Sequence, residues 1–305
     1  MDERAALSLL ADELPHAGDD AAVVDGQVLT TDMLHETRDF PDGTTRYTEG
    51  WRAVGASLSD VAAMGAEATA AVAVYAAPEF DPEELRAFVA GATDVCEAVG
   101  AEYVGGDLDE SREFTATTTA LGRADDPVLR SGASAGEVVC VTGTLGRTGA
   151  ALRLFEQGKI ELANDLFRFE PRVAAGRALA PHATAMMDSS DGLARSLHQL
   201  AEASDCGFAV EWAALPVDES VREVVENGGG RSREGDDETD READLRELAV
   251  FFGEDFELVF TVPEADLSAV RNASPTPISV VGEVTESDVE MDGEDLPDRG
   301  FTHGR

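Results

Sequence analysis

Five short segments of the sequence place aspartates among residues with small side chains. Glycine lets a phosphate approach the backbone, and serine or threonine adds a hydroxyl oxygen beside the carboxylate. Mg²⁺ prefers such oxygen ligands and usually binds one or two carboxylates together with the phosphates of a substrate. The segments are Gly18-Asp19-Asp20, Thr30-Thr31-Asp32, Ser57-Leu58-Ser59-Asp60, Gly105-Gly106-Asp107 and Asp188-Ser189-Ser190-Asp191. Together they indicate a magnesium-dependent site for a phosphorylated ligand such as ATP.

Each segment also has an ordinary structural interpretation. In a chain with 62 acidic residues, Asp beside Gly or Ser is usually a turn residue or a helix cap. The metal-site interpretation therefore depends on all five segments occurring together. Without metal, a ring of carboxylates would repel itself, and some would take up protons.

Two other kinds of site receive less support. The glycine-rich segment 143–149 follows an expected strand and precedes an expected helix, a position that suits phosphate. It lacks the Lys-Ser/Thr ending of a P-loop and the spacing of a dinucleotide fingerprint, so it indicates tight strand–helix packing first and a ligand loop second. The five histidines are scattered, and no Ser-His-Asp arrangement can be argued from them.

The composition restricts the possible partners. The 305 residues include 62 Asp+Glu against 23 Lys+Arg, for a net charge of -39. Such a chain repels nucleic acid and anionic membranes, so we expect neither as a partner. An acidic surface stays soluble when salt screens charge, which favours a halophilic protein in a high-salt cytoplasm. A reducing, cytoplasmic location also fits three widely spaced cysteines, an N-terminus with acids where a signal peptide needs bases, and no apolar run of membrane-spanning length.

The elements that must position the aspartates follow from patterning and from breakers. Asp25-Gly26 suits a two-residue hairpin turn, and Asp81-Pro82 suits the start of a helix that closes at Gly100. Further helices are expected over 5–14, 45–64, 150–157, 172–180 and 192–204. Strands are expected over 21–24, 27–31, 68–76, 102–104, 113–121, 137–142, 184–187, 208–212, 257–262 and 278–284.

This alternation predicts an α/β protein with mixed sheets rather than a doubly wound sheet. Asp, Pro, Ser and Gly accumulate over 125–135, which indicates a boundary between two domains. We assign residues 1–130 to an N-terminal domain that binds ATP and Mg²⁺, and residues 131–305 to a C-terminal α/β domain. Residues 227–243 are almost without apolar side chains and are interpreted as an acidic surface insertion.

Nine motifs resemble the thiamine-monophosphate kinase family in the family's own order. They are GDD at 18–20, TTD at 30–32, SLSDVAAMGA at 57–66, GGD at 105–107, RSGA at 130–133, VTGTLG at 141–146, DSSDGL at 188–193, ASDCG at 203–207 and GEDFEL at 253–258. The family belongs to a superfamily of ATP-binding proteins that includes aminoimidazole ribonucleotide synthetase and selenophosphate synthetase. The resemblance implies a two-domain fold whose N-terminal domains pair in a homodimer to form a β-barrel.

The resemblance also implies roles for single residues. The expected magnesium ligands are Asp20, Thr30, Thr31, Asp32, Asp60, Asp107, Asp188 and Asp191. The expected ATP contacts are Gly106, Asp107, Arg130 and Ser190, and the thiamine contacts are Asp39, Glu254 and Phe301. Of these, Asp60, Asp107 and Arg130 would act on the reacting phosphates. The sequence departs from the family at Asp39, where many relatives carry His, and at Phe252, where the family has the first glycine of GGED.

The implied reaction transfers the γ-phosphoryl group of ATP directly, in line, to thiamine monophosphate, with several Mg²⁺ ions and without other partners. The acceptor oxygen is already ionised near neutral pH, so the reaction needs positioning and charge neutralisation rather than a general base. Two alternatives stay open, namely another ATP-dependent enzyme of the superfamily and a non-catalytic nucleotide-binding paralogue.

Overall fold

The computed structural model describes residues 14, 16–227 and 238–300 of the chain. The N-terminal part consists of β1 (Ala22–Val24), β2 (Gln27–His35), α2 (Glu36–Asp39), α3 (Arg46–Ala63), β3 (Glu67–Ala77), α4 (Pro82–Ala98), β4 (Glu102–Glu110) and β5 (Thr115–Arg123). The helix expected over 5–14 lies outside the described residues, apart from residue 14.

The C-terminal part begins with β6 (Val138–Thr142), α5 (Arg147–Glu156), α6 (Ile160–Phe167), α7 (Val173–Leu179), β7 (Ala185–Asp188), α8 (Leu193–Ser204), β8 (Gly207–Val210), the 3₁₀ turn η1 (Trp212–Ala214) and α9 (Glu219–Asn227). It continues with α10 (Glu238–Arg246), the π-helical turn η2 (Glu247–Phe251), β9 (Leu258–Val262), the 3₁₀ turn η3 (Glu264–Asp266), α11 (Leu267–Ala273), β10 (Ile278–Thr285), β11 (Val289–Met291) and β12 (Glu294–Asp295).

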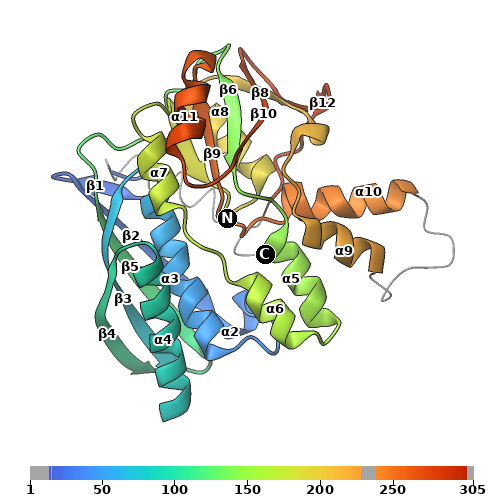
Figure 1. Cartoon of the computed structure of the whole chain (residues 1–305). Coiled ribbons are helices and arrows are strands. Elements are labelled where there is room, and N and C mark those ends of the chain that lie inside the picture. The colour runs from blue at the N-terminus through green and yellow to red at the C-terminus, as the bar shows by residue number, and fades with distance from the viewer. Residues whose placement is uncertain (1–13, 15, 228–237, 301–305) are drawn as a thin grey trace.

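Each part is built on one mixed sheet, and helices pack beside it (Figure 1). The first sheet has the order β1-β2-β5-β3-β4, in which only β3 and β4 run parallel. The second has the order β12-β11-β8-β10-β6-β9-β7, in which only β11 and β8 run parallel. The expected mixed α/β fold is confirmed. Within the described chain the first sheet is open, because its outermost strands β1 and β4 do not pair with each other.

Local sequence signals place the elements as expected. The Asp81 carboxylate accepts hydrogen bonds from the backbone N–H groups of Glu83 and Glu84, with Pro82 in the first turn of α4. Asp25 and Gly26 both have positive φ, as the tight turn between β1 and β2 requires. The hairpin and both ends of α4 therefore follow from local chemistry.

Two of the predicted bounds differ from those in the structure. The strand expected over 208–212 ends at Val210, and Trp212 begins the 3₁₀ turn η1. Within the expected acidic insertion, α10 begins at Glu238. Residues 228–237 lie outside the described residues.

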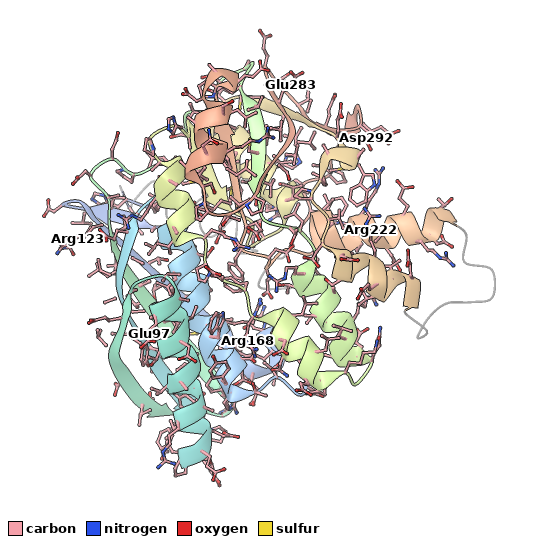
Figure 2. The ribbon with its side chains drawn as sticks, viewed as in Figure 1. Glu97, Arg123, Arg168, Arg222, Glu283 and Asp292 are labelled. Atoms are coloured by element: carbon pink, nitrogen blue, oxygen red, sulfur yellow. The ribbon has the colours of Figure 1, made fainter. Side chains whose placement is uncertain are left out.

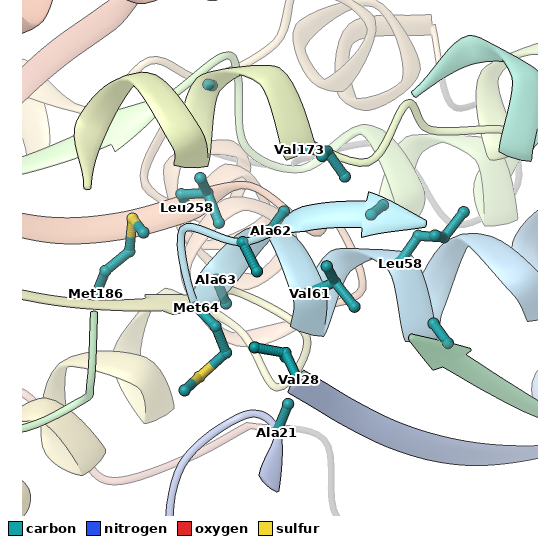
Figure 3. Close-up of a cluster of buried hydrophobic side chains, with 14 of the residues drawn as sticks. Ala21, Val28, Leu58, Val61, Ala62, Ala63, Met64, Val173, Met186 and Leu258 are labelled. Atoms are coloured by element: carbon teal, nitrogen blue, oxygen red, sulfur yellow. The ribbon is translucent and has the colours of Figure 1, made fainter. Parts of the chain in front are cut away.

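One apolar cluster joins the two parts of the molecule. Leu58 and Val61 of α3 and Met64 at its C-terminal cap pack in the same buried cluster as Met186 of β7 and Leu258 of β9 (Figure 3). At about 25 cal/mol per Å² of buried apolar surface, such a shared core fixes the relative position of the two sheets. The consequence for the site is that α3 and the end of β7 lie against each other.

Charged side chains cover the outside of the molecule (Figure 2). Those of Arg123, Glu283 and Asp292, for example, project from its periphery and are exposed. Among the described residues, no helix combines the length and the apolar character that crossing a bilayer requires.

Candidate functional site

Three of the expected aspartates converge between the two parts of the molecule. Asp20 precedes β1, Asp60 lies in the last turn of α3, and Asp188 ends β7. Each offers a carboxylate oxygen, and these oxygens lie within 4.8 Å of one another. The three side chains, more than 160 positions apart in the chain at the extremes, therefore form one acidic cluster.

Asp188 is the most enclosed member of the cluster. Its residue is 0 % exposed, and its carboxylate accepts a hydrogen bond of 2.6 Å from Ser59 Oγ and one of 3.2 Å from the backbone N–H of Ser190. Burial and the nearby Asp20 raise the pKa of Asp188 to about 6, although the two hydrogen bonds oppose this shift. Because α3 supplies Ser59, the packing of α3 against β7 holds this carboxylate in place.

The pKa of Asp60 is also raised, first by burial and then by the charges of Asp32, Asp188 and Asp20. Thr30 Oγ1 donates a hydrogen bond of 2.5 Å to Asp60 Oδ2, which partly opposes that effect. In the absence of a cation, the cluster is thus electrostatically unfavourable. Hard carboxylate and hydroxyl oxygens at this spacing fit a divalent cation such as Mg²⁺.

Strand alternation divides the Thr30-Thr31-Asp32 segment between two faces of the first sheet. Thr30 and Asp32 point towards α3, where Ser57 Oγ donates a hydrogen bond of 2.7 Å to Asp32. Thr31 is exposed on the opposite face and donates its hydroxyl hydrogen bond to the backbone carbonyl of Thr118. The structure therefore does not bring the Thr31 side chain to the cluster.

Arg130 lies in the segment between the two sheets and closes one side of the cluster. Its Nε and Nη2 atoms lie 3.2 and 3.0 Å from the two oxygens of Asp20, and its backbone N–H donates to Asp19. The charges of Asp20, Asp188 and Asp60 raise the pKa of Arg130 despite its burial. One guanidinium cannot neutralise three carboxylates, so the cluster retains negative charge for cations.

Two expected residues of the Asp188 loop lie next to the cluster. Ser190 and Asp191 are partly buried in the turn between β7 and α8. Ser190 uses its backbone N–H for Asp188 and its carbonyl for the backbone N–H of Glu254. This loop is therefore the link between the acidic cluster and the Gly253-Glu254 segment.

Gly106 and Asp107 lie elsewhere, on the edge strand β4. The register aligns Asp32 with Thr118, Thr118 with Ala73, and Ala73 with Gly106, so three strand spacings, about 14 Å, separate β2 from β4 at this level. Asp107 is exposed and pairs with Val74, the residue after Ala73. Its side chain therefore points to the face of the sheet opposite to that of Ala73. In the single chain it does not join the cluster of three.

A cavity of about 630 Å³ lies between α4 and strands β3 and β4. Its lining includes the segment Gly105-Gly106-Asp107, Tyr75, Phe88 and Tyr103. Glycine at 106 has a structural reason, because a Cβ there would lie 1.7 Å from the carbonyl oxygen of Ala73. The cavity has the size and the apolar character of a small-molecule pocket.

The expected thiamine contacts Asp39 and Glu254 lie near the same buried cation, Arg52. Glu254 Oε2 accepts a hydrogen bond of 2.9 Å from Arg52 Nη2, and the charge of Asp39 also favours the charged form of Arg52. Asp39 is itself buried, and its carboxylate accepts from the backbone N–H of His35 at the start of α2. Phe301 lies outside the described residues.

The structure also explains the glycine-rich segment 143–149. The backbone N–H groups of Gly146 and Thr148, at the start of α5, donate to the carboxylate of Asp255. A Cβ at Gly143 would lie 2.1 Å from Glu257 Oε1. The first helix turn is thus occupied by the protein's own carboxylate, which confirms the packing interpretation of this segment over the ligand one.

Arg52 was not among the residues singled out from the sequence. It lies five positions before the Ser57–Asp60 motif, and one arginine in an alanine-rich helix gives no sign that it will be buried. Ser57 and Ser59 were noticed only as small neighbours of aspartates. Their role as hydrogen-bond donors to Asp32 and Asp188 depends on the packing of α3.

Comparison with known proteins gives a consistent result over the whole chain. A family model described as AIR synthase related protein, N-terminal domain, matches residues 18–124, and the corresponding C-terminal domain matches residues 134–292. The thiamine-monophosphate kinase of Halobacterium salinarum is 60% identical over 305 residues, which cover 99% of this chain and 100% of that protein. The thiamine-monophosphate kinase of Methanospirillum hungatei JF-1 is 37% identical over 320 residues and covers 99% of both chains.

Solved structures agree with these relatives. A structure named "AaThiL complexed with AMPPCP and TMP" superposes with a TM-score of 0.86 at 27% sequence identity, covering 99% of this chain and 97% of that one. The match extends over both sheets and therefore over the junction where the acidic cluster lies.

Proposed function

The chain belongs to the thiamine-monophosphate kinase family, and from this premise we propose that it transfers the γ-phosphoryl group of ATP to thiamine monophosphate, giving thiamine diphosphate and ADP. The observation that carries the proposal is the convergence of Asp20, Asp60 and Asp188 at the junction of the two sheets. A self-repelling group of buried carboxylates is suited to holding cations against phosphates.

Several Mg²⁺ ions would be held by this cluster together with Asp32, Thr30 and the Asp188–Asp191 loop. When bound, they would neutralise phosphate charge as it redistributes during transfer. The chain's own part is to hold the ligand oxygens in place through Ser57, Ser59 and Thr30. Arg130, which lies against Asp20, would exchange part of that contact for an ATP phosphate.

The proposed reaction needs no general base from the protein. The attacking oxygen belongs to a phosphate that is already ionised near neutral pH, and the reaction proceeds directly, with the entering and leaving oxygens in line. The residues therefore act by positioning and by charge, which agrees with a site built from carboxylates and one arginine.

The nucleotide would use Gly106, Asp107 and Ser190. The cavity beside Gly105-Gly106-Asp107 offers aromatic and apolar walls for a base. Asp39 and Glu254 would face the thiamine moiety, whose thiazolium ring is cationic. Carboxylates suit such a ligand. Asp39 and Glu254 both lie near Arg52, which is about two turns of α3 away from Asp60.

We also propose a homodimer formed through the outer face of the first sheet. Large apolar side chains are exposed on this face, namely Val24, Leu29, Met33 and Val72. An open sheet edge with apolar neighbours is normally covered. Pairing of two such faces would complete the β-barrel that the family resemblance implies, and it would bring the exposed Asp107 of each chain to the interface.

The direct test measures thiamine diphosphate formed from thiamine monophosphate, ATP and Mg²⁺ in molar KCl. Product formation that stops on chelation of Mg²⁺ supports the proposal. ATP binding without product would leave a non-catalytic paralogue. ATP turnover that depends on a different phosphorylated acceptor would indicate another reaction of the superfamily.

A further inference from the structure

A buried arginine on α3 is not used by the acidic cluster. The Arg52 side chain is 2% exposed. Its guanidinium lies 3.7 Å from the centre of the Phe167 ring, and Nη1 donates to the backbone carbonyl of Phe167. Nη2 donates to Glu254 Oε2, which gives an ion pair that joins α3 to the segment before β9.

A buried arginine that served only to fill space here would be energetically unfavourable. Removing a guanidinium from water is unfavourable unless its partners compensate, and an apolar side chain of similar volume would often pack as well. Among the described residues, the buried Nε–H of Arg52 has no hydrogen-bond partner. Packing alone therefore does not explain an arginine here, whereas holding the Glu254 carboxylate does.

The backbone of Glu254 is held by the Asp188–Asp191 loop, independently of Arg52. Glu254 has a φ of 58°, an unusual conformation for a residue other than glycine, and its N–H donates to the carbonyl of Ser190. The preceding Gly253 also has positive φ, and a Cβ there would lie 2.6 Å from the same carbonyl oxygen. The backbone is thus set by the Asp188–Asp191 loop, while Arg52 holds the side chain from α3.

Helix α3 sets the spacing between this ion pair and the acidic cluster. Arg52, Ala56 and Asp60 lie four residues apart and share one face of the helix. Eight residues of helix span about 12 Å. Over Ala56, between the two ends, the rings of Phe169 and Phe256 stack with centroids 4.1 Å apart. From Asp60 to Arg52, this face of α3 therefore lies against the acidic cluster, then the aromatic pair, and then the Glu254 carboxylate.

We propose that Arg52 is a positioning residue for the organic end of the acceptor substrate. It fixes the Glu254 carboxylate about 12 Å along α3 from the acidic cluster. There this carboxylate contacts the cationic two-ring part of thiamine monophosphate, while the phosphate of the same molecule reaches the cluster. Asp39 adds a second negative charge near the same guanidinium. The inference rests on the proposed function and adds a determinant of acceptor specificity to it.

The test compares Arg52→Met with Arg46→Met by steady-state kinetics. Arg46 is a matched control because it lies on the same helix, pairs with Glu49 and covers the ring of Phe114 at 4.1 Å, but is not part of the proposed site. For Arg52→Met we expect the KM for thiamine monophosphate to rise about tenfold or more, as for loss of a charged hydrogen bond, while the KM for ATP changes less than threefold. For Arg46→Met we expect lower thermal stability and both KM values within about twofold of the parent.

A double variant distinguishes positioning from a general structural effect. If Arg52 acts through Glu254, Arg52→Met combined with Glu254→Gln should raise the KM for thiamine monophosphate no further than the stronger single change. Multiplicative effects would overturn the proposal, as would equal rises in both KM values. Should Arg52→Met fail to fold, Arg52→Lys keeps the charge without the planar group and should still raise the acceptor KM alone.

Wild-type turnover, measured first, separates the two levels of inference. If the parent protein makes no thiamine diphosphate, the proposed function fails. Calorimetric titration of thiamine monophosphate into the parent and into Arg52→Met then tests the positioning role, which predicts a lower affinity for the variant. If the parent is active and the Arg52 variants keep the parent's acceptor KM, only the positioning role is refuted.

Discussion

Replacement of Asp60 by Asn should make the metal-free protein more stable and the enzyme nearly inactive. Asp60 offers a carboxylate oxygen within 4.8 Å of oxygens on both Asp20 and Asp188. Asparagine has almost the same shape and keeps an oxygen that accepts from Thr30, but it carries no charge. The variant therefore tests charge at this position with little change in packing.

The size of the effect follows from the spacing. Two unit charges 4.8 Å apart in a medium of effective dielectric constant near 20 repel by about 3 kcal/mol. Asp60 faces two such neighbours, but burial and these charges raise the pKa of Asp60 and of Asp188, which favours proton uptake and relieves part of the repulsion. We therefore expect a net gain of about 2 kcal/mol in the free energy of unfolding without metal, seen as a rise of a few degrees in Tm.

Two assays measure the opposing consequences. Thermal unfolding in chelator should show the higher Tm of Asp60→Asn, and added Mg²⁺ should stabilise the parent much more than the variant. Turnover at saturating Mg²⁺ should fall by about two orders of magnitude or more, as on removal of a key electrostatic group. The exposed Asp94 of α4 provides the control, since Asp94→Asn should leave the response to Mg²⁺ unchanged. A variant that is less stable in chelator, or that keeps parental turnover, would refute this account of the cluster.

Three further predictions concern the cluster and the charge of the whole chain. Ser59→Ala removes the 2.6 Å hydrogen bond to the buried Asp188 and should lower the free energy of unfolding by about 1–3 kcal/mol. Urea unfolding in saturating Mg²⁺ measures this loss, and a loss below about 0.5 kcal/mol, the effect of a neutral surface change, would contradict the prediction. Because the pKa of Asp188 is raised to about 6 and that of Asp60 is raised as well, Mg²⁺ must displace protons as the pH falls, so its affinity in calorimetric titrations should fall about tenfold or more per pH unit below pH 6. The net charge of -39 should make Tm rise between low and molar KCl, since the Debye length shrinks to about 3 Å at 1 M; a flat or falling Tm would argue against adaptation to salt.

Local sequence chemistry predicted the elements around the site well. The caps of α4 and the Asp25-Gly26 turn depend only on neighbouring residues, so they could be inferred without a fold. The bounds of β8 could not, because the strand ends at Val210 and the backbone N–H of Trp212 donates to the carboxylate of Asp292, a residue 80 positions away. The chemistry of Asp20, Asp60 and Asp188 as hard oxygen ligands was likewise visible from their neighbours.

The sequence by itself determined which side chains have the chemistry to hold cations against phosphates, because carboxylate and hydroxyl ligands are properties of residue type. Only the tertiary structure decided which of them meet. Strand alternation turns the Thr31 side chain away from Thr30 and Asp32, and three strand spacings separate Asp107 from the cluster in the single chain. Only packing shows that Arg52 is buried against Glu254, two residues 202 positions apart, because burial is a property of the folded core and not of a local pattern.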